Sequence, residues 1–209
     1  MNLQSLKITF RNALKNGTLS FAKLFGLSVS FAVILFAVIF VFYETSFDKC
    51  IPDHDRTYRC LMEGRLNAQD ASFAVTSPEM AKAIKSEIPE ITEAIRILDR
   101  GESYIKYNNE TTKWGRMFYA DPEFFSFFSI PIKTSQVNPL ASLTSMVITK
   151  SLALKYFGSV ENALNKTVEI VNEKYIITGV FDDVPKNFHL QPKVILSLQK
   201  SEPDKVGWG

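Results

Sequence analysis

The residues best suited to metal chemistry are the two histidines and the acids beside one of them. His54 lies between Asp53 and Asp55, and imidazole and carboxylate groups both bind divalent cations. Three adjacent residues cannot all point at one ion from regular structure, so we interpret this group as a solvated turn. His189 lies far away in the sequence. The sequence therefore predicts no metal site.

Motifs for nucleotide hydrolysis and for covalent catalysis are missing from the sequence. It has no phosphate-binding loop of the G-x-x-x-x-G-K-[ST] kind, no G-x-S-x-G turn, and no serine or cysteine with a recognisable base partner. The acidic pair Asp182–Asp183 precedes Val184 and Pro185, a combination typical of turns. We therefore expect no catalytic residue, no cofactor and no enzyme activity, so this chain should not hydrolyse ATP itself.

Three other groups of residues could have a chemical function, but each also has a structural or chance explanation. Cys50 and Cys60 could pair outside the cytoplasm, but their spacing does not show that they meet, and we favour two unpaired thiols. The phenylalanines of residues 122–128 could bind lipid or ligand, but aromatics at helical spacing more often form core. The strings Asn109–Thr111 and Asn165–Thr167 match the glycosylation pattern, which is short enough to arise by chance.

An uninterrupted apolar stretch, Leu24–Tyr43, organises the rest of the chain. It has no charge and no proline, and its only polar side chains are Ser28, Ser30 and the terminal tyrosine. About 20 apolar residues match the roughly 30 Å hydrocarbon core of a bilayer. The alternative is a buried core helix, but such a helix usually has one polar face, and this stretch has none. We therefore predict a transmembrane helix over residues 24–43.

The charges that flank this stretch predict its orientation. Lys7, Arg11, Lys15 and Lys23 precede it, and no acid occurs before Glu44. Cytoplasmic flanks collect Lys and Arg, so we expect the N-terminus inside the cell and residues 44–209 outside. A cleaved signal peptide is the rival interpretation. Its charged and apolar regions would both be too long, and no small-x-small cleavage site follows the stretch, so we interpret it as a retained anchor.

The first residues are expected to form an amphipathic helix. Leu3, Leu6, Phe10 and Leu14 recur at helical spacing, with the basic side chains on other faces. We predict that residues 1–23 lie in the cytoplasm, with this helix at the lipid headgroups. Packing on other parts of the same membrane protein is an equally compatible interpretation.

Beyond the apolar stretch the chain is long enough for one domain, and strands and helices alternate irregularly, which predicts an α+β fold. We expect strands at residues 58–66, 73–76, 91–98, 130–133, 146–149 and 194–198, hairpins at 103–119 and, around Asn172 and Glu173, at 167–181, and helices at 77–88 (capped by Ser77), 122–128, 150–157 and 160–164. The expected core comprises Ile84, Ile97, Phe124, Phe125, Phe128, Val147, Ile148, Leu154, Phe157, Ile177 and Val180.

Net charge argues against nucleic acid as a partner. The chain has 24 basic and 22 acidic side chains. Four of the basic residues precede residue 24, so the remainder of the chain has 20 basic and 22 acidic residues. No basic patch with interleaved aromatic residues is present in the sequence.

Several stretches, in order along nearly the whole chain, resemble one family. They are residues 10–16 (FRNALKN), 46–49 (SFDK), 55–59 (DRTYR), 119–128 (YADPEFFSFF), 147–158 (VITKSLALKYFG) and 177–190 (ITGVFDDVPKNFHL). These stretches are similar to FtsX/MacB-type ABC transporter permeases, most of all the subgroup typical of Bacteroidetes, and to the MacB-like periplasmic core domain. Phe188 stands where the family more often has a small polar residue, and Cys50 and Cys60 also depart from its pattern.

The resemblance implies a membrane subunit of an ABC transporter in the bacterial inner membrane. A separate ATPase subunit would hydrolyse ATP, and the permease, as a homo- or pseudo-dimer, would pass that motion to its periplasmic domain for export, lipoprotein handling or activation of a periplasmic partner. Family subunits carry further membrane helices after this domain, so we interpret the chain as an N-terminal fragment with an incomplete core domain. The alternative function is a single-pass anchored sensor or binding domain that needs no ATPase.

Overall fold

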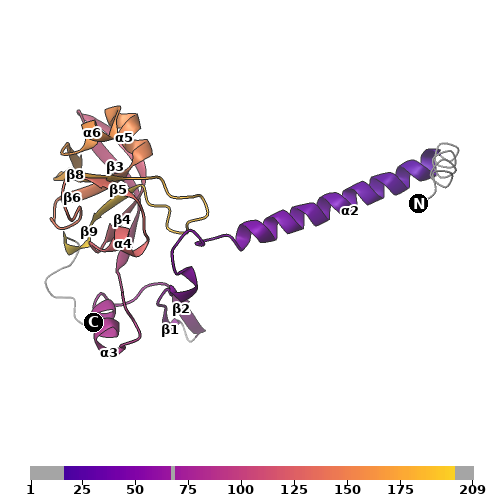
Figure 1. Cartoon of the computed structure of the whole chain (residues 1–209), viewed down its shortest axis with the longest axis horizontal. Coiled ribbons are helices and arrows are strands. Elements are labelled where there is room, and N and C mark those ends of the chain that lie inside the picture. The colour runs from indigo at the N-terminus through magenta and orange to yellow at the C-terminus, as the bar shows by residue number, and fades with distance from the viewer. Residues whose placement is uncertain (1–16, 67–68, 201–209) are drawn as a thin grey trace. The chain divides into compact units, whose positions relative to one another are not determined.

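The structure is a computed structural model that describes residues 17–66 and 69–200 (Figure 1). The expected amphipathic helix at the N-terminus and the tail after residue 200 lie outside the described residues. The chain divides into two compact units, Met1–Phe47 and Asp48–Gly209.

In the described part of the first unit, residues 17–47, the chain forms one long helix, α2, over Gly17–Glu44. None of its residues is buried, and Phe36 and Phe42 are about 70% exposed. The hydroxyls of Ser28 and Ser30 donate to the carbonyl oxygens four residues earlier, at 2.8 and 2.9 Å, which satisfies both polar side chains within the helix. Among the described residues, α2 is the one helix long and apolar enough to cross a membrane. Since none of its described residues is buried, α2 does not have the burial of a core helix.

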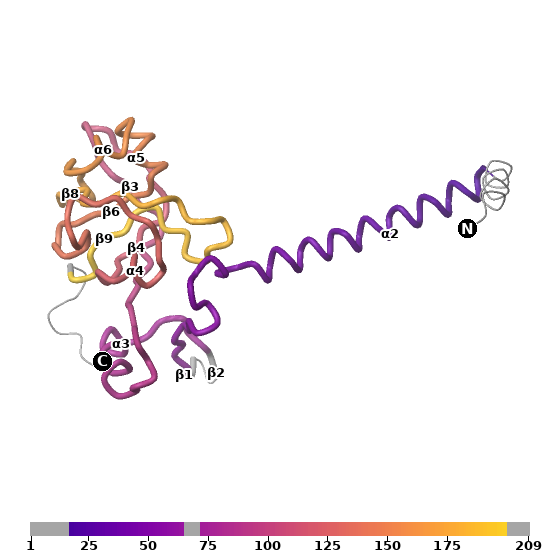
Figure 2. The backbone as a smooth tube through the Cα atoms, viewed as in Figure 1, coloured from indigo at the N-terminus to yellow at the C-terminus, as the bar shows by residue number. Residues whose placement is uncertain are grey.

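The second unit is built on a mixed seven-stranded sheet (Figures 1 and 2). Its strand order is β5-β8-β6-β9-β4-β3-β7, and β7 also pairs with β8, so the sheet curls round and meets itself. The pairs β4–β9 and β6–β8 are parallel and the other pairs are antiparallel. The strands are β3 (Ile97–Tyr107), β4 (Glu110–Ala120), β5 (Ile132–Thr134), β6 (Ser145–Thr149), β7 (Thr167–Ile170), β8 (Glu173–Phe181) and β9 (Val194–Ser197).

Short helices and a separate hairpin complete this unit. The elements outside the sheet are η1 (His54–Arg56), β1 (Met62–Leu66), β2 (Gln69–Phe73), α3 (Met80–Glu87), α4 (Phe124–Phe127), α5 (Lys150–Phe157), α6 (Val160–Ala163) and η2 (Leu198–Lys200). This mixture of helices with parallel and antiparallel strands confirms the predicted α+β fold.

The central strands β6 and β9 are buried along their whole length, because core packs against both faces of the sheet. Residues on alternate positions of a strand face opposite sides. Met146 and Ile148 therefore contribute to a core together with α5 and α6, whereas Val147 contributes to a second core together with α4. We call these the α5 core (which also includes Ile105, Trp114, Leu152, Tyr175, Ile177, Val194 and Leu196) and the α4 core (Ala120, Phe124, Phe125, Leu140, Val147, Phe181 and Ile195).

Several local predictions are confirmed. The β3–β4 hairpin turns at Asn108 and Asn109, whose φ values of 50° and 64° are the left-handed values that asparagine tolerates in a tight hairpin turn. Helix α5 occupies the predicted residues, and Gly158 ends it with a φ of 76°. Most of the expected core residues are buried or pack against a core from a partly buried position.

Leu154 is wrong as a core prediction, because it is half exposed. Helix α5 buries Leu152 and Ala153 and turns Tyr156 and Phe157 toward the same core. At 100° per residue, position 154 points away from that face. The predicted core residue Ile84, on α3, is partly buried and belongs to neither the α5 core nor the α4 core.

Several boundary predictions are also wrong. The strands expected at residues 58–66 and 73–76 are β1 at Met62–Leu66 and β2 at Gln69–Phe73. The strand expected from residue 91 begins at Ile97, and just before it the backbone N–H of Arg96 donates to the carboxylate of Asp121 instead of to a backbone carbonyl. Helix α3 begins after Glu79, and no side chain caps it, so Ser77 is not its cap. The β7–β8 turn lies at Val171 and Asn172, one residue earlier than predicted, with left-handed φ values of 48° and 64°. A β-branched residue rarely adopts that conformation, so the twist of the hairpin imposes it here.

Candidate functional site

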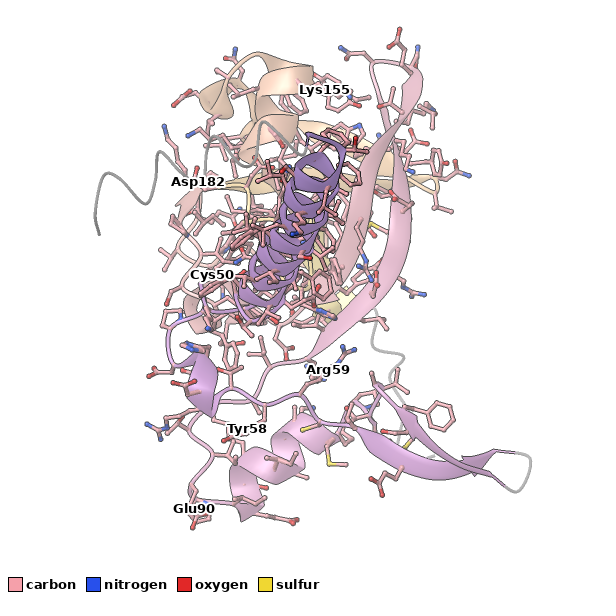
Figure 3. All side chains as sticks on the ribbon, turned by 90° about the vertical axis from the view of Figure 1, so that its right-hand side faces the viewer. Cys50, Tyr58, Arg59, Glu90, Lys155 and Asp182 are labelled. Carbon is pink, nitrogen blue, oxygen red and sulfur yellow. The ribbon has the colours of Figure 1, made fainter. Side chains whose placement is uncertain are left out.

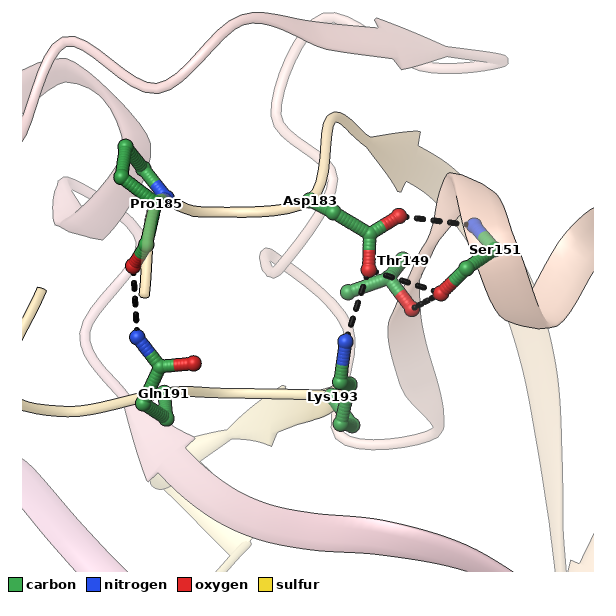
Figure 4. Close-up of polar contacts among 6 residues, drawn as sticks. All are labelled: Thr149, Ser151, Asp183, Pro185, Gln191 and Lys193. Atoms are coloured by element: carbon green, nitrogen blue, oxygen red, sulfur yellow. Dashed lines mark hydrogen bonds and ion pairs between the residues drawn. The ribbon is translucent and has the colours of Figure 1, made fainter. Parts of the chain in front are cut away.

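The loop of residues 182–193, between β8 and β9, brings together parts of the chain that lie far apart in sequence (Figure 4). Asp183, near its start, binds the first turn of α5, and Phe188, in its middle, packs on Phe128 at the end of α4. Lys193, its last residue, makes backbone hydrogen bonds to β4 and to the end of β6. We call this segment the β8–β9 loop. Nothing in its composition marks it as more than a surface connection.

Asp183 serves as the cap of helix α5 from a distant position in the chain. Its carboxylate accepts the backbone N–H of Ser151 at 2.9 Å and the hydroxyl of Ser151 at 2.7 Å. Thr149, the residue before the helix, makes no cap of its own, and its hydroxyl lies 3.1 Å from that of Ser151. The first N–H groups of a helix lack partners within it, and a negative charge there is favourable. Asp183 is therefore more than the turn residue that the sequence predicts.

Lys193 completes this cluster from the other end of the loop. Its ammonium group donates to Asp183 at 2.7 Å, while its backbone N–H donates to Arg116 of β4 at 2.9 Å. Its carbonyl accepts the N–H of Thr149 at 3.1 Å. One residue thus joins the loop to β4 and to the end of β6. Sequence reasoning missed this role, because no local pattern connects a lysine before one strand to an acid after another.

The surroundings of Asp183 change the pKa of its carboxyl. Burial alone would raise the pKa, but hydrogen bonds from Lys193 and Ser151 outweigh burial and hold the pKa below its ordinary value. The ionised carboxylate is therefore the form that the folded chain favours.

We expect the effect of Asp183→Asn on stability to depend on pH. A folded pKa below the unfolded one means that the carboxylate stabilises the fold above the unfolded pKa, roughly 3.9 for Asp, and that this stabilisation is lost as pH falls through the folded pKa. Asp183→Asn should thus unfold more easily than the wild type at neutral pH, and the difference should shrink between about pH 5 and pH 2. Urea unfolding at a series of pH values measures it, and a difference that stays constant with pH would contradict the assignment.

The middle of the β8–β9 loop is folded on itself and packed on α4. The side-chain amide of Gln191 donates to the carbonyls of Pro185 and Phe188, at 2.6 and 2.7 Å. The ring of Phe188 is 2% exposed and lies 5.3 Å from the ring of Phe128. Phe128 in turn lies 4.9 Å from Phe124 in the α4 core. Phe188, the aromatic residue that departs from the family pattern, therefore attaches the middle of the β8–β9 loop to the α4 core.

The candidate ligands and thiols of the segment after α2 lie apart from this loop in sequence. His54 is in the short helix η1, with its Nε2 3.2 Å from Asp55, and the part of the chain that the structure describes contains no group of three potential metal ligands. Cys50, which Figure 3 labels, and Cys60 are both exposed and unbonded, in agreement with the favoured interpretation. Nearby, Arg59 donates to the carbonyl of Ala74 at 3.2 Å.

The other candidate groups have ordinary places in the fold. Phe124 and Phe125 are buried in the α4 core and Phe128 packs against it from a partly buried position, so these three phenylalanines of residues 122–128 are core residues. Asn109 and Asn165, the first residues of the two glycosylation strings, are exposed at turns.

A comparison with protein families decides the identity of this domain. The family model of the MacB-like periplasmic core domain matches residues 20–207. The chain belongs to this family. The stretches of residues 147–158 and 177–190 that carry the resemblance in sequence are the ones that Asp183 and Ser151 join in space. Two of the stretches that resemble the family are thus in contact in this fold, through the β8–β9 loop and α5.

Three solved structures are similar to parts of this chain. A domain ascribed to a permease protein from Porphyromonas gingivalis is 26% identical to this chain, with a TM-score of 0.56, and the alignment covers 65% of this chain and 57% of that domain. The periplasmic region of MacB from Actinobacillus actinomycetemcomitans is 12% identical (TM-score 0.46; coverage 60% and 56%). The extracellular domain of the ABC-type transporter YknZ from Gram-positive bacteria is 14% identical (TM-score 0.47; coverage 59% and 63%).

This MacB-like chain therefore spans less than two thirds of each of these solved domains. No curated protein matches it. The family is that of transporter permease components, which work with separate ATPase subunits and are in general not enzymes. The apolar helix and the periplasmic-type domain together indicate an inner-membrane protein.

Proposed function

We propose that this chain is the membrane subunit of an FtsX/MacB-like ABC transporter. In this proposal a separate ATPase subunit hydrolyses ATP, and the resulting movement of the membrane helices changes the conformation of the periplasmic domain. The work done there would be export, lipoprotein handling or activation of a partner protein. The observation that carries the proposal is a fully unburied apolar helix followed directly by a MacB-like domain.

The proposal includes a layout of the chain in the membrane. Residues 1–23 lie in the cytoplasm and contact lipid headgroups, residues 24–43 span the bilayer, and residues 44–209 form the periplasmic domain. The basic residues before the span and the acids after it support this orientation. Two permease units, as a homo- or pseudo-dimer, would pair with the ATPase subunits, and no contact with nucleic acid is proposed.

Recovery of an ATPase subunit tests this function. A permease that contains this domain together with its later membrane helices should bring down an ABC ATPase from mild detergent, and the 209-residue chain should recover much less. A C-terminal reporter on the 209-residue chain should be active only outside the cytoplasm. Absence of any ATPase from the longer permease would contradict the transporter proposal and favour the anchored sensor. A reporter active in the cytoplasm would contradict the orientation.

A further inference from the structure

Asp48, the first residue of the second unit, is bound on two sides to the β8–β9 loop. Its backbone N–H donates to the carbonyl of Asn187 at 2.8 Å, and its side-chain Oδ1 accepts the backbone N–H of His189 at 2.8 Å. Asp48 and His189 are 141 positions apart in the sequence. We call this pair of hydrogen bonds the Asp48 clasp. Both bonds use backbone groups of the loop, so they fix its path whatever side chains it carries.

The conformation of Asp48 suits this contact. Its φ of 57° is left-handed, a region that aspartate and asparagine tolerate better than most residues. The carbonyl of Asp48 accepts the N–H of Ile51 at 3.0 Å, which closes a turn, and the side chain of Ile51 is 7% exposed. The chain is thus turned sharply and anchored at the point where the second unit begins.

Only residues 45–47 lie between the end of α2 and Asp48 in the sequence. After the helix ends at Glu44, the N–H of Thr45 donates to Val41 at 2.9 Å and the N–H of Ser46 donates to Tyr43 at 3.1 Å. The ring of Phe47 meets the ring of Tyr43 edge-on, with 5.3 Å between centroids. Thr45, Ser46 and Phe47 therefore continue the end of α2 as bonded turns within the first unit.

On the other side, the clasp leads into the core of the domain. Asn187 and His189, its two partners, flank Phe188, whose ring packs on Phe128 beside the α4 core. The same loop holds the start of α5 through Asp183. A displacement of Asp48 would therefore move a segment that is fixed to helices on both faces of the sheet.

We infer that the Asp48 clasp is the joint through which movement of the membrane helix reaches the periplasmic domain. Asp48 is in this sense a positioning residue: it transmits a displacement and takes part in no chemistry. The inference rests on the proposed function, because it is the transporter cycle that moves the helix.

Three variants of Asp48 distinguish the contribution of its side-chain acceptor from that of its left-handed backbone. Asp48→Gly keeps the left-handed backbone and removes the acceptor for His189, whereas Asp48→Asn keeps both the acceptor and the tolerance for that backbone. Asp48→Ala removes the acceptor and also strains the backbone. Amide hydrogen exchange of residues 187–189 should be roughly tenfold faster in Asp48→Gly than in the wild type, and close to wild type in Asp48→Asn.

Transmission is tested in a permease that contains this domain, together with its ATPase. In the wild type and Asp48→Asn, addition of Mg-ATP should change hydrogen exchange in the β8–β9 loop. In Asp48→Gly, ATP hydrolysis should continue while that change is lost. Fluorescence of Trp114, which is 2% exposed and stacked on Tyr156 at 4.6 Å, should be unchanged and thereby show that the domain is folded.

The possible outcomes distinguish this inference from the proposed function. An Asp48→Gly variant that hydrolyses ATP and keeps the Mg-ATP response of the loop would overturn the clasp as a joint and leave the transporter function intact. Unchanged exchange at residues 187–189 in that variant would overturn the clasp itself. A wild-type complex in which the loop never responds to Mg-ATP would overturn the proposed function and the joint together.

Discussion

Replacing Phe124 by alanine should lower the free energy of unfolding by about 3–5 kcal/mol, the usual cost of removing a buried aromatic ring. Phe124 has no exposed surface, and its ring lies 5.3 Å from that of Phe125 and 4.9 Å from that of Phe128. Alanine would leave a cavity between the sheet and the aromatic residues to which the β8–β9 loop is attached. Urea unfolding of the chain in detergent, followed by the fluorescence of buried Trp114, measures the loss.

Leu154→Ala is the matched control, because it removes an apolar side chain from a residue that is 50% exposed. The expected loss is below about 1 kcal/mol, since about half of that residue already contacts solvent. Equal losses for Phe124→Ala and Leu154→Ala would show that the α4 core is poorly packed or that Phe124 is wrongly placed in it.

Asp121→Asn should cost about 3 kcal/mol, because it leaves a largely buried guanidinium without its carboxylate. Asp121 accepts three bonds from Arg96: one from the backbone N–H at 2.8 Å and two from the guanidinium at 3.0 and 2.7 Å. The side chains are only 18% and 12% exposed. The pair fixes the chain just before β3 to the start of α4. Urea unfolding followed by tryptophan fluorescence measures this loss as well.

A second arginine–aspartate pair provides the control for solvent exposure. Arg116 and Asp99 also form hydrogen bonds, but their side chains are 48% and 38% exposed. Asp99→Asn should therefore cost no more than about 1 kcal/mol. A loss as small for Asp121→Asn as for Asp99→Asn would contradict the structural role of the Arg96–Asp121 pair.

Local sequence patterns predicted much of the fold. The β3–β4 hairpin follows from strand-forming residues on either side of Asn108 and Asn109, and helix α5 from its apolar positions and Gly158. Turn chemistry and helical spacing act over a few residues, so they can be recognised in a single sequence. The apolar span followed from length and composition alone.

Contacts over long sequence separations could not be predicted in this way. Asp183 looked like a turn residue because its partner Ser151 is 32 positions away, and the contact of Arg96 with Asp121, just before β3 begins, spans 25 positions. The closure of the sheet through β7 likewise depends on pairings between distant strands. The candidate site consists almost wholly of such contacts. The family resemblance identified the stretches of residues 147–158 and 177–190, which form this site, without showing that they are in contact.

The strand order also constrains how this domain can be made. The last strand in the sequence, β9, lies in the middle of the sheet, between β6 and β4. A ribosome releases the chain from its N-terminus, so the anchor and the first six sheet strands emerge before the strand that joins them. Until residue 197 is available, β4 and β6 each lack a neighbour and the α4 core lacks Ile195. The domain must therefore remain open through most of its synthesis, which is the state in which a polypeptide can still be threaded across a membrane.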